Sequence, residues 1–311
     1  MPNLVTITFS PCIDKSVTVP VLLPEKKLHC TEPILEPGGG GINIARAINK
    51  LGYSATAIYP AGGCTGAQFS SILATEHVPV IVIESKYEMR VNLNVLNEAT
   101  NLQYRFIMPG IELLPGEWQA CLNAIDSIKD PSYIIVSGSL PPGVPIDIFH
   151  QIAGIARQKK ARLIVDTSRE ALLQLKDCGV FLLKPNLSEL SMLAGRNEIH
   201  LEQIESVARE VIANGYCEMM VVSIGSTGAM LVTKDKVFRA IPPAVKIKGT
   251  VGAGDSMVAG LVISLNLGKS FEDTIRYAVA CGTAACLNAG TALCNQQDVE
   301  RLLSLTRVFN A

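Results

Sequence analysis

The chain has 311 residues, and its 48% hydrophobic and 18% charged content indicates a folded globular protein rather than a disordered one. This length allows one α/β domain with an added part, or two domains. The formal net charge of −1 gives no overall positive field to attract nucleic acid or an anionic membrane. The longest apolar run, 257–267, is too short to span a bilayer, so neither nucleic acid nor a membrane is expected as a partner.

The cysteines and histidines indicate a reduced protein without a zinc site. The nine cysteines form no CxxC pair, and the four histidines show no spacing typical of metal ligands. The N-terminal residues show no signal-peptide pattern, so we expect free thiols and a cytoplasmic location. Cys12 is more consistent with a small packed hydrophobe than with a catalytic thiol.

The first predicted strand covers residues 4–9 and ends in a polar turn that contains Asp14. In open α/β sheets, ligands bind beyond the carboxyl ends of the strands. Asp14 therefore either holds substrate hydroxyl groups or organises the turn. Residues 15–35 contain Pro20 and Pro24 and lack a helical period, so we expect strands outside the main sheet.

Four consecutive glycines, 38–41, precede Asn43 and a helix predicted over residues 44–51. Such a run costs backbone entropy that an ordinary turn does not require. It favours a ligand that lies against bare backbone, with the Asn43 amide offering both a donor and an acceptor. A flexible linker is the weaker alternative, because a helix begins at once and no Ser-rich spacer is present.

The next segment continues the α/β pattern and then departs from it. Its predicted elements are a strand over 54–59, a helix over 67–76 and a strand over 78–84. Residues 90–95 and 102–107 then alternate as a polar-faced hairpin that carries Arg90 and Arg105. Exposed arginines are usually solvated, but beside the glycine run these two would form a clamp for a phosphate on the substrate.

From residue 115 onward, helices and strands alternate regularly, which predicts a parallel sheet covered on both faces. The predicted helices cover 116–128, 146–158, 201–214, 271–288 and 297–305, and the predicted strands cover 133–136, 162–165, 181–183 and 219–222. Polar residues gather just after the strands, namely Ser139, Asp166, Lys184, Asn186, Glu189 and Ser223. That clustering predicts a site along the carboxyl edge of the sheet.

The stretch 248–256 leads from small residues directly into an apolar helix. Gly252, Ala253 and Gly254 let an anion approach the free N–H groups at the helix start, where the helix dipole is positive. Asp255 places a carboxylate beside that anion, which is unfavourable unless the carboxylate takes part in chemistry. Transfer of a phosphoryl group, with Asp255 as the base, explains both features. From this stretch alone, a glycine-rich turn with an acidic residue in the first helical turn explains them equally well.

Three motifs in this order resemble the PfkB, or ribokinase-like, carbohydrate kinases: GGGGxN at 38–43, NxxE at 186–189 and GAGD at 252–255. The resemblance extends over essentially the whole chain, and three ordered motifs are more specific than any one of them. Runs such as SPCIDKS, SGSLPPGV and TVGAGDSMVAG are similar to the phosphosugar branch of the family, above all to its bacterial type 2 6-phosphofructokinases. A dehydrogenase is not expected, because no GxGxxG follows the first strand.

The resemblance implies a fold and a division of the chain. The fold would be a ribokinase-like three-layer α/β/α sandwich with a mostly parallel central sheet and a small β-sheet lid. The core would comprise residues 1–14, 36–87 and 111–311, and the lid residues 15–35 and 88–110. Such a lid closes over ATP and sugar to exclude water, and in the phosphosugar branch two lids pair across a homodimer.

The resemblance also implies roles for single residues. Asp255 would be the base, and the N–H groups of Gly252, Ala253 and Gly254 would bind the γ-phosphoryl group in transfer. The sugar hydroxyls would be held by Asp14, Gly39 and Asn43, and its existing phosphate by Arg90, Arg105 and Ser139. The nucleotide would lie against Lys27, Lys184, Asn186, Ser223, Gly225, Gly228, Thr250 and Val251, with Lys27 reaching across the dimer.

Two cations are implied. Glu189 would orient Mg²⁺ through water, since this ion keeps several waters and few protein ligands. K⁺ would be held by backbone carbonyls around Gly249, Val251, Asn288 and Gly290. Many family members carry an acidic residue two positions before Val251, where this chain has Gly249. Potassium activation is therefore a weaker inference than magnesium dependence.

The implied reaction is ATP-dependent phosphorylation of D-fructose 6-phosphate at O1 to fructose 1,6-bisphosphate, a step of glycolysis. Tagatose 6-phosphate and fructose 1-phosphate stay open as substrates, because the epimeric difference is one hydroxyl group and the sequence does not resolve it. A regulator that binds nucleotide or sugar phosphate without catalysis is a further alternative. The intact Asp255, Glu189 and 252–254 speak against that alternative.

Overall fold

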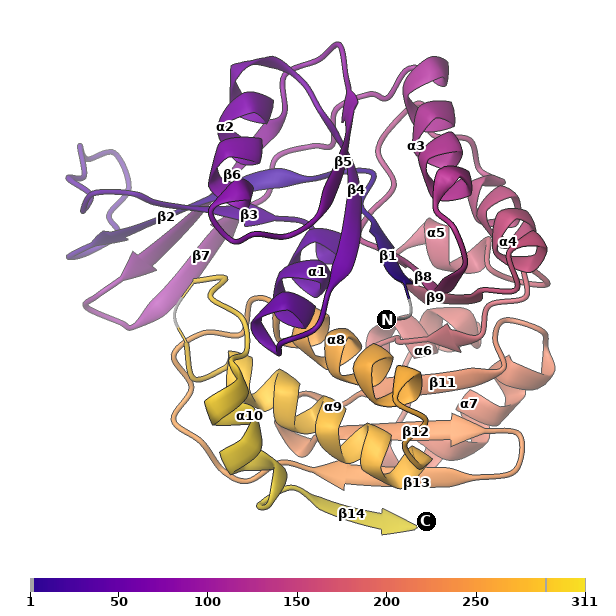
Figure 1. Ribbon diagram of the computed structural model, residues 1–311. Coiled ribbons are helices and arrows are strands. Elements are labelled where there is room, and N and C mark those ends of the chain that lie inside the picture. The colour runs from indigo at the N-terminus through magenta and orange to yellow at the C-terminus, as the bar shows by residue number, and fades with distance from the viewer. Residues whose placement is uncertain (1–2, 289, 311) are drawn as a thin grey trace.

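The computed structural model describes residues 3–288 and 290–310, and its main feature is one long sheet with helices on both faces (Figure 1). In spatial order the strands of this sheet are β14 (Arg307–Asn310), β13 (Val237–Ile241), β12 (Ala229–Thr233), β11 (Met219–Ser223), β10 (Leu182–Leu183), β9 (Arg162–Asp166), β8 (Pro131–Ser137), β1 (Asn3–Ile7), β4 (Ala55–Ala61) and β5 (Val80–Glu84).

The sheet is parallel from β5 to β11 and antiparallel from β11 to β14. The central strand β1 pairs with β8 and β4, and its residues Leu4, Val5 and Ile7 are buried because helices cover both faces. The antiparallel edge was not predicted from the sequence. Only a short 3₁₀ turn at Gly225–Thr227 joins β11 to β12. Strand β12 continues into β13 through a tight turn in which Thr233 N–H donates to the Lys236 carbonyl at 2.8 Å, so no crossover helix separates these strands.

The helices bury their apolar residues in two clusters, one on each face of the sheet. One face is covered by α1 (Gly40–Lys50), α2 (Gly63–Ala74), α8 (Ala253–Asn266), α9 (Phe271–Ala285) and α10 (Gln296–Leu303). The other face is covered by α3 (Pro115–Ser127), α4 (Ile148–Gln158), α5 (Glu170–Leu173), α6 (Leu187–Leu193) and α7 (Ile204–Ala213). The expected three-layer α/β/α arrangement with a mostly parallel sheet is thus confirmed.

Helices α8 and α9 pack closely, and this contact positions the site. A side chain on Gly260 would lie 2.9 Å from both Ala278 Cα and Cys281 Sγ, so glycine allows the two helices to touch. The apolar residues of α8 from Met257 to Ile263 are buried, which anchors the start of this helix against the core. Within the described residues, no helix is both long and apolar enough to cross a membrane.

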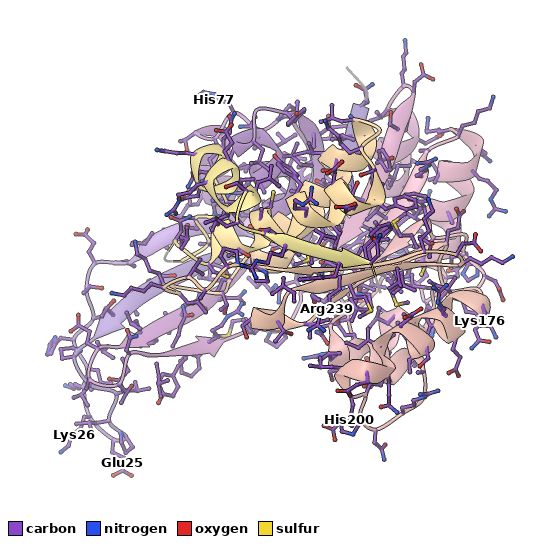
Figure 2. The ribbon with its side chains drawn as sticks, turned by 90° about the horizontal axis from the view of Figure 1, so that it is seen from below. Glu25, Lys26, His77, Lys176, His200 and Arg239 are labelled. Carbon is purple, nitrogen blue, oxygen red and sulfur yellow. The ribbon has the colours of Figure 1, made fainter. Side chains whose placement is uncertain are left out.

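A second, four-stranded sheet projects from the body of the molecule (Figure 1). In spatial order its strands are β3 (Ile34–Gly38), β2 (Cys12–Val19), β6 (Arg90–Asn97) and β7 (Leu102–Phe106). The loop after β2 carries Glu25 and Lys26 to the far tip of this small sheet (Figure 2). The strands extend beyond the expected lid segments, because 12–14 and 36–38 belong to β2 and β3.

Candidate active site

The start of α8 is fixed by a position that requires glycine. Gly252 has φ 75° and ψ 2°, a left-handed conformation that disfavours other residues, and it is the N-cap of the helix. A side chain there would also collide with Leu293. The first helical bond runs from Ser256 N–H to the Gly252 carbonyl at 2.8 Å. The N–H groups of Gly254 and Asp255 before it therefore lack helical partners at the positive end of the helix dipole, while Ala253 N–H makes only a long contact of 3.4 Å with the Thr250 carbonyl.

Asp255 lies in this first turn of α8. The Asn43 amide nitrogen donates to Asp255 Oδ2 at 2.9 Å. Burial raises the pKa of Asp255 to about 6, and the negative charges of Asp166 and Asp14 act in the same direction. The Asn43 hydrogen bond and the Lys184 ammonium oppose this rise. A carboxylate with a pKa near 6 is ionised at neutral pH and is still basic enough to accept a proton.

Lys184 is a buried ammonium group behind the start of α8. Its Nζ lies 3.2 Å from Asp166 Oδ1, and a Cβ on Gly254 would lie 3.6 Å from the same nitrogen. Burial acts to lower the pKa of Lys184, but the carboxylates of Asp166, Glu189 and Asp255 outweigh burial and raise it. Lys184 therefore keeps its positive charge behind the open N–H groups.

The NxxE motif forms a capping box at the start of α6. The Asn186 side-chain oxygen accepts from Glu189 N–H at 2.9 Å, and Glu189 Oε2 accepts from Asn186 N–H at 2.8 Å. Burial raises the pKa of the Glu189 carboxyl, while the bond from Asn186 N–H opposes the rise. The motif thus stabilises the helix and leaves Glu189 Oε1 for a ligand.

A cavity of about 420 Å³ opens on Asp255 from the side of the small sheet. Polar groups from both sheets and from the starts of α1 and α8 dominate its lining. The lining residues are Cys12, Asp14, Gly39, Gly40, Asn43, Arg90, Asn92, Arg105, Ile107, Ser137, Gly138, Ser139, Asp166, Thr167, Ser168, Glu189, Thr250, Val251, Gly252 and Asp255. We call this cavity the polar cavity.

Arg90 is held rigidly at the wall of the polar cavity. Its Nη1 donates to the Met108 carbonyl and its Nη2 to the Ser10 carbonyl, each at 2.8 Å. Its Nε is buried and has no hydrogen-bond partner within the described part of the chain. A guanidinium carries five N–H donors, so Arg90 retains donors for an anionic ligand.

A second cavity, of about 650 Å³, lies on the other side of the first turn of α8. Its lining residues are Asn186, Ser223, Gly225, Ser226, Gly228, Pro242, Pro243, Ala244, Val245, Ile247, Thr250, Ala253, Gly254, Met257, Val279, Gly282, Thr283 and Cys286. We call it the apolar cavity. An apolar slot with a few polar groups suits a planar base and the phosphates attached to it.

The two cavities meet at the start of α8. Thr250 lines both of them, Ala253 and Gly254 line the apolar cavity, and Gly252 and Asp255 line the polar cavity. The open N–H groups and the Asp255 carboxylate therefore stand at the boundary between two compartments. A group that passes from a ligand in one compartment to a ligand in the other must pass these donors.

The run of four glycines is explained largely by the packing of the chain against itself. Added side chains would collide at all four positions: Gly38 with Asp14, Gly39 with Thr8, Gly40 with Ser137, and Gly41 with Thr8 and Ile7. Helix α1 begins at Gly40, four residues before its expected start, so two of the glycines are helical. Gly39 and Gly40 line the polar cavity. The expected contact between a ligand and bare backbone is thus available at the two middle glycines.

The residues expected to bind sugar or nucleotide fall into four groups. Asp14, Gly39, Asn43, Arg90, Arg105, Ser139 and Val251 line the polar cavity. Asn186, Ser223, Gly225 and Gly228 line the apolar cavity, and Thr250 lines both. Lys184 lies buried behind the start of α8. Lys27 lines neither cavity, because it lies in the exposed loop whose tip carries Lys26 (Figure 2).

The loops expected to hold a monovalent cation are neighbours. Lys248 N–H, before α8, donates to the Cys286 carbonyl, after α9, at 2.9 Å. Asn288 donates through its amide to the Leu293 carbonyl at 2.9 Å, which leaves its side-chain oxygen available. Gly249, Val251, Asn288 and Gly290 thus belong to adjoining loops.

Glu36 joins the small sheet to the second of these loops. Its Oε2 accepts from Thr291 N–H at 2.8 Å, and a side chain on Gly290 would collide with it. Leu293 in the same loop lies against Gly252. A chain of contacts therefore runs from β3 to the start of α8 without crossing the large sheet.

The acidic groups near the cavity boundary are Asp166, Glu189 and Asp255. Within residues 3–288 and 290–310, no group of three or more His, Cys, Asp or Glu side chains is arranged to hold a metal ion by itself. One or two carboxylates with substrate phosphates and water are the ligands that Mg²⁺ prefers. This donor set therefore fits Mg²⁺ bound together with a nucleotide.

Comparison with known proteins identifies the family. Residues 7–298 match the pfkB family carbohydrate kinases. The chain belongs to this family. The ATP-dependent 6-phosphofructokinase isozyme 2 of Escherichia coli K12 is 43% identical over 303 residues, which cover 97% of this chain and 98% of that protein. A 1-phosphofructokinase of Borreliella burgdorferi is 29% identical over 304 residues, 97% of each chain.

Solved structures agree with this assignment. The E. coli phosphofructokinase-2 in complex with potassium has a TM-score of 0.94 and 42% identity, and covers 98% of this chain and 99% of that chain. The same protein in complex with fructose-6-phosphate has a TM-score of 0.92 and 41% identity, with the same coverage. The expected resemblance to pfkB kinases and to type 2 6-phosphofructokinases is confirmed.

Sequence reasoning assigned no role to several residues of this pfkB kinase site. Asn92 hydrogen-bonds Asp14 and lines the polar cavity, and its signal was the alternation of polar residues along β6. Asp166 follows a strand and was noticed only as part of a polar cluster, but it pairs with Lys184. The α9 residues of the apolar cavity give no local signal, because only the packing of α9 on α8 brings them there.

The raised pKa of Asp255 predicts that its ionised form destabilises the fold. Because the native pKa is about 6 and the ordinary value is 3.8, the folded state binds the proton more tightly, and stability falls as pH rises from about 4 through 6. Asp255→Asn should therefore be more stable than wild type at pH 7.5, by about 1–3 kcal/mol, and the gain should disappear below pH 4. Urea unfolding measures this. Asp235→Asn, at an exposed turn, should change the free energy of unfolding little. An Asp255→Asn protein that is no more stable than wild type at pH 7.5 would contradict the raised pKa of Asp255.

Proposed function

We propose that this pfkB kinase transfers the γ-phosphoryl group of ATP to O1 of D-fructose 6-phosphate and forms fructose 1,6-bisphosphate. The observation that carries the proposal is the first turn of α8, which presents open N–H groups and the Asp255 carboxylate between two cavities. The higher identity to a 6-phosphofructokinase than to a 1-phosphofructokinase supports the choice of sugar.

The chemistry follows from the groups at the cavity boundary. Asp255 accepts the proton of the sugar hydroxyl, and Asn43 holds this carboxylate in place through its 2.9 Å hydrogen bond. The N–H groups of Gly252, Ala253 and Gly254 stabilise the charge that develops on the phosphoryl oxygens. Lys184 adds a fixed positive charge from behind.

The sugar phosphate would occupy the polar cavity. Asp14, Gly39 and Asn43 face the space where its hydroxyl groups would lie. Arg90, Arg105 and Ser139 would bind the existing phosphate, because all three line this cavity and each terminal nitrogen of Arg90 keeps a second N–H besides the one bonded to a carbonyl. The two arginines reach the cavity from strands β6 and β7 of the small sheet.

The nucleotide would occupy the apolar cavity, with its phosphates toward the start of α8. Asn186, Ser223, Gly225, Gly228 and Thr250 line that space. Mg²⁺ bound with ATP would neutralise charge on the transferring phosphates, with Glu189 as the residue that orients it through water. K⁺ would lie between the loops of Gly249, Val251, Asn288 and Gly290, and the potassium complex of the E. coli relative supports this assignment.

The small sheet would act as a lid and as a dimer interface. Strand β7 is exposed along its whole length, and its alternate residues Leu102, Tyr104 and Phe106 form an apolar face opposite the side that carries Arg105. An exposed apolar edge strand promotes association unless it is covered. A second copy of the chain would cover it, and in such a dimer Lys27 from one chain could reach the nucleotide of the other.

The proposed reaction predicts a clear order of sugar preference. With Mg²⁺ and ATP, kcat/KM for fructose 6-phosphate should exceed that for tagatose 6-phosphate and for fructose 1-phosphate, measured by ADP release. Turnover should fall as pH drops below about 6, because Asp255 must be ionised to act as the base. Asp255→Asn should lose turnover by about 10³-fold or more but still bind ATP. ATP binding without ADP release from any sugar would indicate a non-catalytic regulator instead.

The proposed phosphate clamp predicts a selective effect of Arg90→Ala. Loss of charge-assisted hydrogen bonds should raise the KM for fructose 6-phosphate about 10- to 100-fold and change the KM for ATP far less. Arg90→Lys keeps the positive charge but loses the planar guanidinium group. It therefore tests whether charge alone or the paired N–H donors bind the phosphate. Arg301→Ala, on the surface of α10, is the matched control. Equal effects on both substrates would argue against the clamp.

The proposed dimer predicts a response to one change on β7. Tyr104→Asp should convert the protein to a monomer in sedimentation velocity and reduce turnover, since a charge would replace an apolar contact. Val82→Asp places the same charge at an exposed apolar position on the edge strand β5 of the large sheet, and it should leave the dimer intact. A wild-type protein that sediments as a monomer with full activity would overturn this proposal.

A further inference from the structure

Asn92 is buried in the middle of β6, and every hydrogen-bonding atom of its side chain is engaged. Its Nδ2 donates to Asp14 Oδ1 at 3.0 Å and to Cys12 Sγ at 3.1 Å. Its Oδ1 accepts from Met108 N–H at 3.0 Å. A fully satisfied buried amide of this kind has one orientation, because rotating it by half a turn would oppose donor to donor and acceptor to acceptor.

The fixed amide decides which oxygen of Asp14 is engaged within the strand and which stays free for a ligand. Oδ1 is taken by Asn92, with Cys12 Sγ at 3.5 Å as a weaker donor. Oδ2 lies over Gly38, where any side chain would collide with it. The absence of a side chain on Gly38 therefore leaves room for this oxygen, and Asn92 prevents the carboxylate from turning it away.

The partner of Asn92 on its other side is a peptide that also touches Arg90. Met108 donates its N–H to Asn92 and accepts from Arg90 Nη1 at 2.8 Å through its carbonyl. The backbone of one residue, Met108, thus fixes Asn92 and the proposed phosphate ligand Arg90 relative to each other through its two flanking peptide units. Both ends of the bound sugar phosphate would be held by groups anchored on this residue.

We propose that Asn92 is a positioning residue for the sugar, one that holds Asp14 with Oδ2 presented to a substrate hydroxyl and couples that carboxylate to the Met108 peptide. This inference rests on the proposed function, because it takes Asp14 as the ligand of a sugar hydroxyl. Asn92 itself acts through Asp14 rather than on the reacting atoms.

The residue type at position 92 is specific to this task. Leucine would leave the Met108 N–H without a partner and Asp14 Oδ1 with only the weak Cys12 thiol donor. Aspartate has the same shape and can still accept from Met108 N–H, but its second oxygen would oppose the Asp14 carboxylate unless a proton lies between them. The other ionisable groups that face this pair are Cys12 on β2, Arg90 on β6, Arg105 on β7 and, across the polar cavity, Asp255 on α8.

The test compares Asn92→Asp with Asn97→Asp in the full-length protein. Asn97 is also buried and lies at the far end of β6, so its variant introduces the same charge into the same strand away from Asp14. Steady-state kinetics with fructose 6-phosphate and Mg²⁺-ATP are recorded from pH 6 to 8.5, together with thermal melting of each variant. Asn92→Ala removes all three hydrogen bonds of the side chain without adding charge, and it replaces the aspartate variant if that variant does not fold.

The proposal expects the KM for fructose 6-phosphate to rise by roughly tenfold or more in Asn92→Asp at pH 8, with the KM for ATP nearly unchanged. The defect should shrink toward pH 6, because protonation of the carboxyl pair restores the donor to Asp14. Asn92→Ala should show the same rise without the recovery. Asn97→Asp should leave both KM values near those of wild type, whatever its melting temperature.

A double-mutant cycle checks that Asn92 acts through Asp14. In an Asp14→Asn background, the additional change at position 92 should have little further effect on the sugar KM. The inference is overturned if Asn92→Asp and Asn97→Asp alter the sugar KM equally, or if the effects at positions 14 and 92 simply add. A wild-type protein that does not phosphorylate fructose 6-phosphate would instead refute the proposed function.

Discussion

At the centre of this site, three carboxylates lie near one buried ammonium group, which leaves an excess of negative charge. The rest of the structure is arranged around this charged cluster. Asp166 pairs with Lys184, while Glu189 and Asp255 also act on it from nearby. A cluster with excess negative charge is tolerated only where a cation or a hydrogen-bond donor compensates it. The Asn186 N–H compensates Glu189, and Asn43 compensates Asp255. The excess negative charge that remains suits a site that binds a metal–nucleotide complex and accepts a proton from the substrate.

This charge cluster can exist because four separate segments converge on it. Strands β9 and β10 carry Asp166 and Lys184 to the carboxyl edge of the sheet, and α6 and α8 present Glu189 and Asp255 at their first turns. Helix α8 is held at this place by its buried apolar residues and by its close contact with α9. The packing of the core thus determines the position of the charges to within hydrogen-bond distances.

The sequence was informative where one local rule determines the structure. The GAGD stretch does begin a helix, and its left-handed Gly252 explains why a glycine stands there. The NxxE motif was read as a metal and phosphate motif, while the structure adds a capping box that could have been recognised from the same spacing. The antiparallel pair β12 and β13 was missed, because short strands without an intervening α-helix resemble turns in a chain of alternating elements, and β14 is a four-residue strand after the last helix. The explanation of the glycine run from the sequence was also incomplete, because the side chains that pack against it, such as Ser137 and Thr8, come from distant parts of the sequence.

The contact between Glu36 and the loop after α9 connects the small sheet to the start of α8, whose N–H groups are proposed to bind the phosphoryl group. Glu36 stands opposite Asp14 in the register of β2 and β3, so it moves with the sugar side of the site. Through Thr291 and Leu293 it reaches Gly252 by a path of a few residues. A displacement of the small sheet would therefore be transmitted to Gly252 at the start of α8 along this loop rather than through the strands of the large sheet.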